Sequence, residues 1–216
     1  ITNCSMGEIV SVVDTRQIKS VESSAAEEKQ YLRFLTAASL FDGHDAAINI
    51  MRRMLQSSGA EVIHLAHNRS VQEIVRAAIQ EDVDAIAISS YQGGHIEYFK
   101  YLVDQLKSQG AEHIQVFGGG GGVIIPAEID ELHNHGVARL YSPADGQSLG
   151  LQGMIDDMLQ RTRDAKCAFK PQIDALTSGD RIQLTRSISR IEHNAYSDSE
   201  LNEQRLLAAT VGTPRL

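Results

Sequence analysis

Three short segments of this chain carry residue types that could bind a cofactor or a metal ion. The first contains Asp42 and His44, which are two residues apart, so the carboxylate can fold back onto the imidazole. Such a pairing fixes the tautomer of the histidine and strengthens its other nitrogen as a metal ligand. The second segment begins at Ser89, and the third is the run of five glycines at 118–122. The sequence therefore predicts a ligand site in which His44 is the candidate metal ligand.

The glycine run offers no side chains, so a large ligand can lie against bare backbone. A phosphate-binding role is disfavoured, because no G-x-x-x-x-G-K-[ST] or G-x-G-x-x-G sequence opens a helix after the first predicted strand. We expect His95, which follows Gly93 and Gly94, to cap a helix or contact the ligand rather than to bind a metal. Structural alternatives are open for three features: His44 as a loop histidine held by its carboxylate, the glycines as a flexible loop, and Ser89 as a hydroxyl that bonds its own backbone.

Strand-like and helix-like segments alternate from Tyr31 to about residue 163. Five units of this kind predict an α/β fold with a flavodoxin-like (Rossmann-like), doubly wound, five-stranded parallel sheet. In such a sheet ligands bind beyond the carboxyl ends of the strands, near the point where strand order reverses. For the flavodoxin-like order this point lies between the first and third strands, where the three segments would meet. The predicted strands are Tyr31–Ala37, Glu61–Leu65, Ala85–Ser89, Ile114–Phe117 and Val137–Tyr141.

The pattern divides the chain into three parts. Residues 1–29 have no clear periodicity and are predicted to be an N-terminal extension or linker. Residues 30–165 form the predicted α/β domain. Residues 166–216 contain only helical spacing, which predicts a helical extension whose apolar side needs a partner surface.

Composition excludes several classes of protein. The net charge is −8 and no long run of Lys or Arg occurs, so we predict no nucleic-acid partner. The two cysteines, Cys4 and Cys167, form no C-x-x-C pair, which argues against a disulfide framework or a zinc ribbon. No apolar run reaches the roughly 18 residues of a membrane span. The N-terminus lacks the order of a signal peptide, so we predict a cytoplasmic protein with no membrane partner.

The three segments together resemble the cobalamin-binding domain of the methylmalonyl-CoA mutase and methionine synthase families. The family pattern is D-x-H-x-x-G, followed by S-x-L and then by a Gly-Gly pair after the fourth strand. This chain has the corresponding elements at 42–47, 89–91 and 118–119, in the same order. Ala47 and Tyr91 replace the Gly and Leu of the pattern, so the pocket for the nucleotide tail of the cofactor would be lined differently.

The resemblance is closest to the fused isobutyryl-CoA mutase branch of the acyl-CoA mutases, through the segments SLFDGHDAA, SYQGGH and the five glycines. In that branch the cobalamin domain precedes a G-protein chaperone domain and a substrate-binding barrel. The resemblance implies that these residues belong to an isomerase that uses adenosylcobalamin and acts on an acyl-CoA. Residues 166–216 would be the lead-in to the chaperone domain. Without the barrel, we expect the chain to bind the cofactor but to turn over no substrate.

The resemblance also implies a mode of binding, with the cofactor's own base displaced and His44 on cobalt. Asp42 would support His44, and the displaced tail would lie between the first and third strands. The residues implied to contact the cofactor are Asp42, Gly43, His44, Asp45, Ala46, Ser89, Tyr91, Gly93, Gly94, His95, Gly118, Gly119 and Gly120.

Two other functions agree less well with the sequence. A stand-alone cobalamin carrier or sensor would usually have a helical cap domain before the sheet, and here only the unpatterned residues 1–29 precede it. A phosphorylated receiver domain would need an aspartate at the end of the third strand, where this chain has Ser89 and Ser90.

Overall fold

The computed structural model describes residues 31–168, 181–192 and 196–211. The predicted N-terminal linker lies outside these residues, as do residues 169–180 of the predicted helical extension. The sheet has five parallel strands in the order β2-β1-β3-β4-β5, which confirms the flavodoxin-like fold. Strand bounds differ from the predicted ones by at most two residues. They are β1 Arg33–Ala38, β2 Glu61–His64, β3 Ala85–Ser89, β4 Gln115–Gly119 and β5 Arg139–Tyr141.

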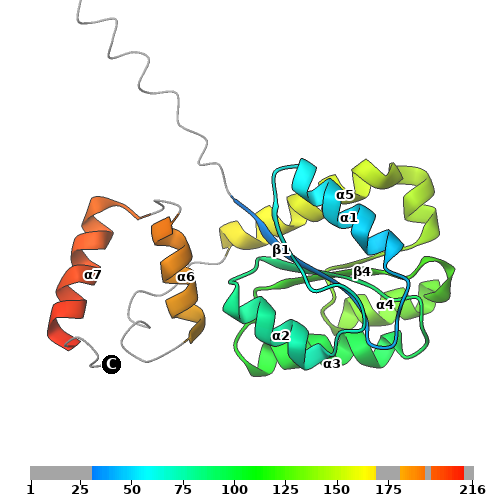
Figure 1. The fold of residues 1–216 in the computed structure, drawn as a ribbon, viewed down its shortest axis with the longest axis horizontal. Coiled ribbons are helices and arrows are strands. Elements are labelled where there is room, and N and C mark those ends of the chain that lie inside the picture. The colour runs from blue at the N-terminus through cyan, green and yellow to red at the C-terminus, as the bar shows by residue number, and fades with distance from the viewer. Residues whose placement is uncertain (1–30, 169–180, 193–195, 212–216) are drawn as a thin grey trace, which may run out of the picture. The chain divides into compact units, whose positions relative to one another are not determined.

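Helices cover both faces of the sheet (Figure 1). Helices α1 (Ala46–Ser57) and α5 (Pro143–Ala168) lie on one face. Helices α2 (Val71–Gln80), α3 (His95–Ser108) and α4 (Pro126–His135) lie on the other, and a short 3₁₀ helix, η1 (Gly121–Val123), follows β4. Because side chains alternate along a strand, each face has its own hydrophobic core.

The side chains on the two faces of β3 differ in size. Ile86 and Ile88 point toward the core under α2 and α3, whereas Ala85 and Ala87 belong to the core under α1 and α5. Ser89 continues the second set, by the alternation of the strand. Small side chains on this face leave room between the sheet and the helices above it.

Helix ends follow the sequence signals. Gly59 and Gly110 come just after α1 and α3 with φ of 89° and 74°, the left-handed conformation typical of glycine beyond a helix. Helix α2 begins at the N-cap Ser70, which forms a capping box with Glu73. No helix within the described residues is long and apolar enough to cross a membrane.

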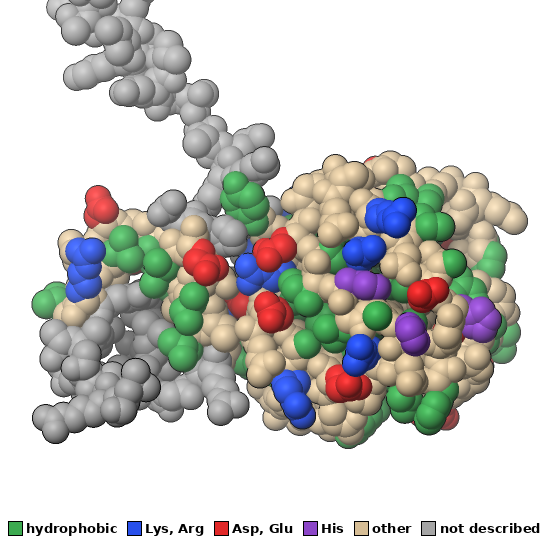
Figure 2. Space-filling model, viewed as in Figure 1, with side chains coloured by type: hydrophobic (Ala, Val, Ile, Leu, Met, Phe, Trp, Pro, Cys, Tyr) green, Lys and Arg blue, Asp and Glu red, His purple; other side chains and the backbone are tan. Residues whose placement is uncertain are grey.

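The predicted helical extension contains α6 (Arg181–Glu192) and α7 (Asp198–Val211). Helix α6 contacts α2, and Ile182 packs against the core beneath it. The Arg186 guanidinium lies 3.4 Å from a carboxylate oxygen of Asp82, and both side chains are largely buried. Elsewhere, on the face shown in Figure 2, basic and acidic side chains are interspersed rather than gathered by sign.

A pH dependence of stability is expected from His113. Burial, followed by the nearby charge of Arg186, lowers the pKa of His113 to about 4. In the unfolded chain a histidine titrates near pH 6.5, so the unfolded state takes up the proton first as the pH falls. The burial of neutral His113 therefore costs no stability above about pH 6.5. Between about pH 6.5 and pH 4 the free energy of unfolding falls, by up to about 3 kcal/mol, because only the unfolded state is protonated there. Urea unfolding at several pH values, compared between wild type and His113→Gln, measures it. Equal pH slopes in the two proteins would contradict the expectation.

Candidate functional site

Asp42 joins two of the three predicted loops. Its carboxylate is fully buried, and one oxygen accepts hydrogen bonds from the backbone N–H of His44 at 2.9 Å and from its Nδ1 at 2.8 Å. The other oxygen accepts from the backbone N–H of Tyr91 at 2.5 Å. The loop after β1 is thereby fixed to the loop after β3, the two strands that flank the switch point.

The charge of Asp42 decides the tautomer of His44. Burial alone would raise the pKa of the Asp42 carboxyl, but the N–H groups of Tyr91 and His44 and the imidazole of His44 together bring it below its ordinary value. Asp42 is therefore an acceptor at neutral pH, and the Nδ1 of His44 carries the hydrogen. The lone pair of Nε2 is then available to a metal ion, on a side chain that is 65% exposed. This is the arrangement that the Asp-x-His spacing predicts.

A cavity of about 340 Å³ lies between the sheet and the helices α1 and α5. Ala47 and Tyr91, the two departures from the family pattern, both line it. Most of the lining is apolar. The complete lining is Ala47, Ile48, Ile50, Met51, Ala87, Ile88, Ser89, Tyr91, Gly118, Gly119, Gly120, Gly121, Tyr141, Ser142, Pro143, Gly146, Leu151, Met154 and Met158.

Ser89 contributes a polar atom to this apolar cavity. Its hydroxyl is buried and has no hydrogen-bond partner within the described part of the chain. The alternative that the hydroxyl bonds its own backbone is therefore not what the structure shows. Because a buried hydroxyl without a partner is costly, Ser89 is suited to bond a ligand that enters the cavity.

Gly118, Gly119 and Gly120, at the end of β4, differ in how much room a side chain would have. A Cβ on Gly118 would lie 2.7 Å from Cε1 of Phe99 and 2.8 Å from Cδ2 of Leu140, both in the core on the far face of the sheet. A Cβ on Gly120 would collide with the carbonyl oxygen of Ser90. At Gly119 the nearest atom would be the carbonyl oxygen of Tyr141, at 3.2 Å. Packing therefore explains Gly118 and Gly120, whereas Gly119 has moderate room for a side chain.

The other predicted residues lie around the cavity rather than in its lining. Gly43 is exposed, and Asp45 and Ala46 form the N-cap and first residue of α1. Gly94 is the left-handed N-cap of α3, and Gly93 precedes it. His95 is the first residue of α3, where its Nε2 lies 2.9 Å from a carboxylate oxygen of Glu128 in α4.

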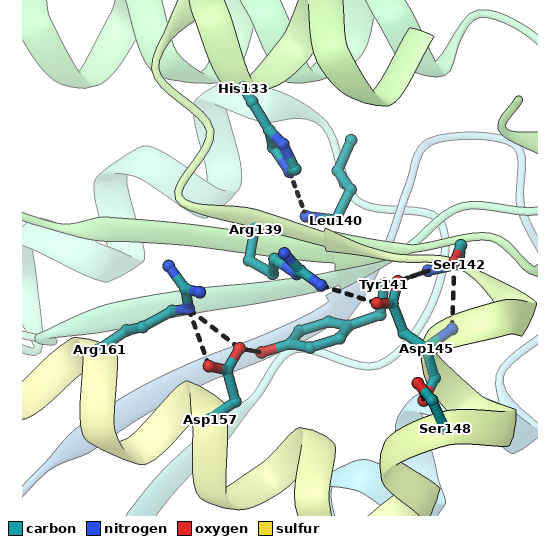
Figure 3. A network of polar contacts seen from close by, with 9 residues as sticks. All are labelled: His133, Arg139, Leu140, Tyr141, Ser142, Asp145, Ser148, Asp157 and Arg161. Atoms are coloured by element: carbon teal, nitrogen blue, oxygen red, sulfur yellow. Dashed lines mark hydrogen bonds and ion pairs between the residues drawn. The ribbon is translucent and has the colours of Figure 1, made fainter. Parts of the chain in front are cut away.

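Sequence reasoning missed the wall of the cavity that β5 and α5 provide (Figure 3). The hydroxyl of Tyr141 donates a hydrogen bond to Asp157 at 2.8 Å, and Arg161 holds the same carboxylate at 2.9 Å. Burial and the neighbouring Asp157 raise the pKa of Tyr141, so its hydroxyl stays protonated and donates. Asp157 and Arg161 are spaced as a helical pair, but nothing in the sequence links either residue to Tyr141.

Ser142 and Asp145 fix the start of α5 beside this wall. The hydroxyl of Ser142 donates to Asp145 at 2.7 Å, and Arg139 pairs with the other oxygen of Asp145, also at 2.7 Å (Figure 3). The end of β5 and the first turn of α5 are thus held together where they border the cavity.

Comparison with known proteins gives consistent matches. Fused isobutyryl-CoA mutase from Cupriavidus metallidurans is 64% identical over 171 residues, which cover 79% of this chain but only 16% of that protein. The small subunit of pivalyl-CoA mutase from Xanthobacter autotrophicus is 34% identical over 52% of this chain and 74% of that one. A cobalamin-binding protein from Desulfitobacterium hafniense has the same fold, with a TM-score of 0.51 at 20% identity over 61% of this chain and 60% of its own. Residues 32–162 match the B12 binding domain, so the chain belongs to the family of B12-binding domains.

Proposed function

We propose that this chain binds adenosylcobalamin as the cobalamin-binding part of an acyl-CoA mutase that interconverts isobutyryl-CoA and n-butyryl-CoA. The identity of 64% to a fused isobutyryl-CoA mutase supports this assignment. Since the chain spans 16% of that relative, the acyl-CoA would be bound elsewhere, by a substrate-binding barrel. A G-protein chaperone domain would be the second partner, in the same polypeptide or in a separate one.

The observation that carries the proposal is the Asp42–His44 pair beside a cavity that contains the unpartnered Ser89 hydroxyl. No group of three or more potential metal ligands occurs among the described residues, so a bare metal ion would have too few protein ligands there. A cobalt ion already held by a macrocycle would need only one further ligand from the protein. The exposed Nε2 of His44 is suited to that role.

The cavity fits the displaced tail of the cofactor. An aromatic base on a sugar needs an apolar slot with few polar contacts, and the cavity offers apolar walls, the Ser89 hydroxyl and the bare backbone at Gly119. Gly118 and Gly120 would contribute indirectly, since a side chain at either would displace its neighbours. Gly43, Asp45, Ala46, Gly93, Gly94 and His95 would border the bound corrin.

When bound, the cofactor would supply a cobalt–carbon bond that breaks homolytically, the chemistry needed for carbon-skeleton rearrangement. The residues of this chain position that bond. Asp42 holds the proton on Nδ1 of His44 and fixes the plane of the imidazole. Apolar side chains that line the cavity, among them Met51 and Met154, would exclude water from the tail of the cofactor.

The test is a spectroscopic titration of the purified chain with adenosylcobalamin, followed by reduction to cobalt(II) and paramagnetic resonance. We expect wild type to show coupling of cobalt to an imidazole nitrogen and His44→Ala to lose it. His67→Ala, at an exposed histidine that follows β2, is the matched control and should behave as wild type. Persistent coupling to the cofactor's own base would refute the role of His44, and a complete lack of binding would refute the proposed function.

A further inference from the structure

Phe41 has a backbone conformation that its residue type disfavours. The N–H of Asp42 donates to the carbonyl oxygen of Ser39 at 3.1 Å, which closes a four-residue turn with Phe41 at its third position. The φ of Phe41 is 64°. Turns with a positive φ at this position ordinarily use glycine or asparagine, and a bulky aromatic residue there is strained. Some gain from the side chain must offset this strain.

Backbone hydrogen bonds hold the turn, but packing of the Phe41 ring within the fold supplies no such gain. Phe41 is 80% exposed, so its ring does little to stabilise the core. Its backbone is nevertheless fixed, because its N–H donates to the side-chain oxygen of Asn68 at 2.9 Å. Asn68 also has a positive φ, of 56°, which asparagine tolerates well. The loops after β1 and β2 thus fix the backbone that carries this exposed aromatic ring.

The position of Phe41 indicates what its ring contacts. It directly precedes Asp42, whose carboxylate fixes His44, and three residues of chain place its Cα within about 11 Å of that of His44. The ring of Tyr91 lies beside that of His44, with a centroid separation of 5.7 Å. The candidate metal ligand therefore has Tyr91 beside it and Phe41 three residues before it, at the carboxyl end of the sheet.

We propose that the ring of Phe41 packs against the corrin macrocycle whose cobalt His44 binds, and so helps to hold the cofactor; this inference rests on the proposed function. A corrin presents a broad, largely apolar face that extends several ångströms from the metal, and an exposed aromatic ring carried on a fixed backbone near His44 matches that surface. The strain at Phe41 is then offset in the bound state rather than in the fold of the free chain.

The experiment compares Phe41→Gly, Phe41→Ala and Phe41→Tyr in thermal unfolding without cofactor and in titration with adenosylcobalamin. Glycine relieves the backbone strain, so we expect Phe41→Gly to unfold at a temperature no lower than wild type and yet to bind the cofactor about tenfold more weakly. Phe41→Ala should bind as weakly as Phe41→Gly, whereas Phe41→Tyr keeps the ring and should bind within about twofold of wild type.

A matched control separates strain from contact. Ala66 also has a positive φ, of 63°, and follows β2 outside the lining of the cavity. Ala66→Gly should relieve its strain and leave cofactor affinity unchanged. If Phe41→Gly binds adenosylcobalamin as tightly as wild type, the inference is overturned, and the ring serves another partner such as a protein surface. If wild type itself does not bind, the proposed function fails first, and this outcome is distinct because it requires no variant.

Discussion

Adding one methyl group at Gly118 is expected to lower the free energy of unfolding by about 3 kcal/mol. The new Cβ would collide with the ring of Phe99, lying 2.7 Å from its Cε1, and would lie 2.8 Å from Cδ2 of Leu140; both residues are fully buried. Neither neighbour can retreat, since α3 carries Phe99 against the sheet and β5 pairs with β4 beside Gly118. Urea unfolding of Gly118→Ala, followed by circular dichroism, measures the loss.

Gly119→Ala is the matched comparison. Its Cβ would face the cavity, 3.2 Å from the carbonyl oxygen of Tyr141 and 4.0 Å from its Cβ, so a small shift accommodates it. We expect a loss of stability below about 1 kcal/mol together with weaker binding of adenosylcobalamin, because the methyl group narrows the space proposed for the tail. Equal losses of stability at both glycines would show that the two faces of β4 are not packed differently.

Replacing Asp42 with alanine is expected to cost about 2–4 kcal/mol of stability and to abolish coupling of cobalt to the imidazole. The substitution leaves the backbone N–H groups of Tyr91 and His44 without their acceptor and breaks the link between the loops after β1 and β3. His44 also loses the group that fixes its tautomer. Chemical unfolding and the cobalt(II) spectrum of the same sample report both effects.

Two further measurements test this account of Asp42. His44→Ala removes the imidazole but keeps the bonds to both backbone N–H groups, so its loss of stability should be clearly smaller. The lowered pKa of Asp42 adds stability that is present above the unfolded pKa of about 3.9 and is lost as the pH falls through the folded pKa. Asp42→Ala should therefore weaken the acid dependence of unfolding. If wild type and Asp42→Ala lose stability equally as the pH falls, the stabilising charge belongs to another residue.

The sequence alone determined the fold and the centre of the candidate site. Alternating strand and helix patterns are local properties of the chain, and the carboxyl ends of β1, β3 and β4 must meet at one edge in any parallel sheet of this order. The Asp42–His44 pair could be predicted because two residues two positions apart interact through local geometry. The second contact of Asp42, to the backbone N–H of Tyr91, depends on the pairing of β1 with β3. It could not be predicted from residue types, because the donor is a backbone group.

Tertiary structure alone decided what each position in the glycine run does and how the cavity is closed. Gly118 and Gly119 are the same residue type, yet a side chain at Gly118 would meet a buried aromatic ring and one at Gly119 would face the cavity, because successive residues of a strand face opposite layers. The wall formed by Tyr141 and α5 comes from residues far along the chain from His44, brought there by β5 at the edge of the sheet. Phe41 carries no sequence signal for its positive φ, which the turn from Ser39 to Asp42 and the bond to Asn68 impose. Such features depend on distances between segments, and residue type and spacing do not encode those distances.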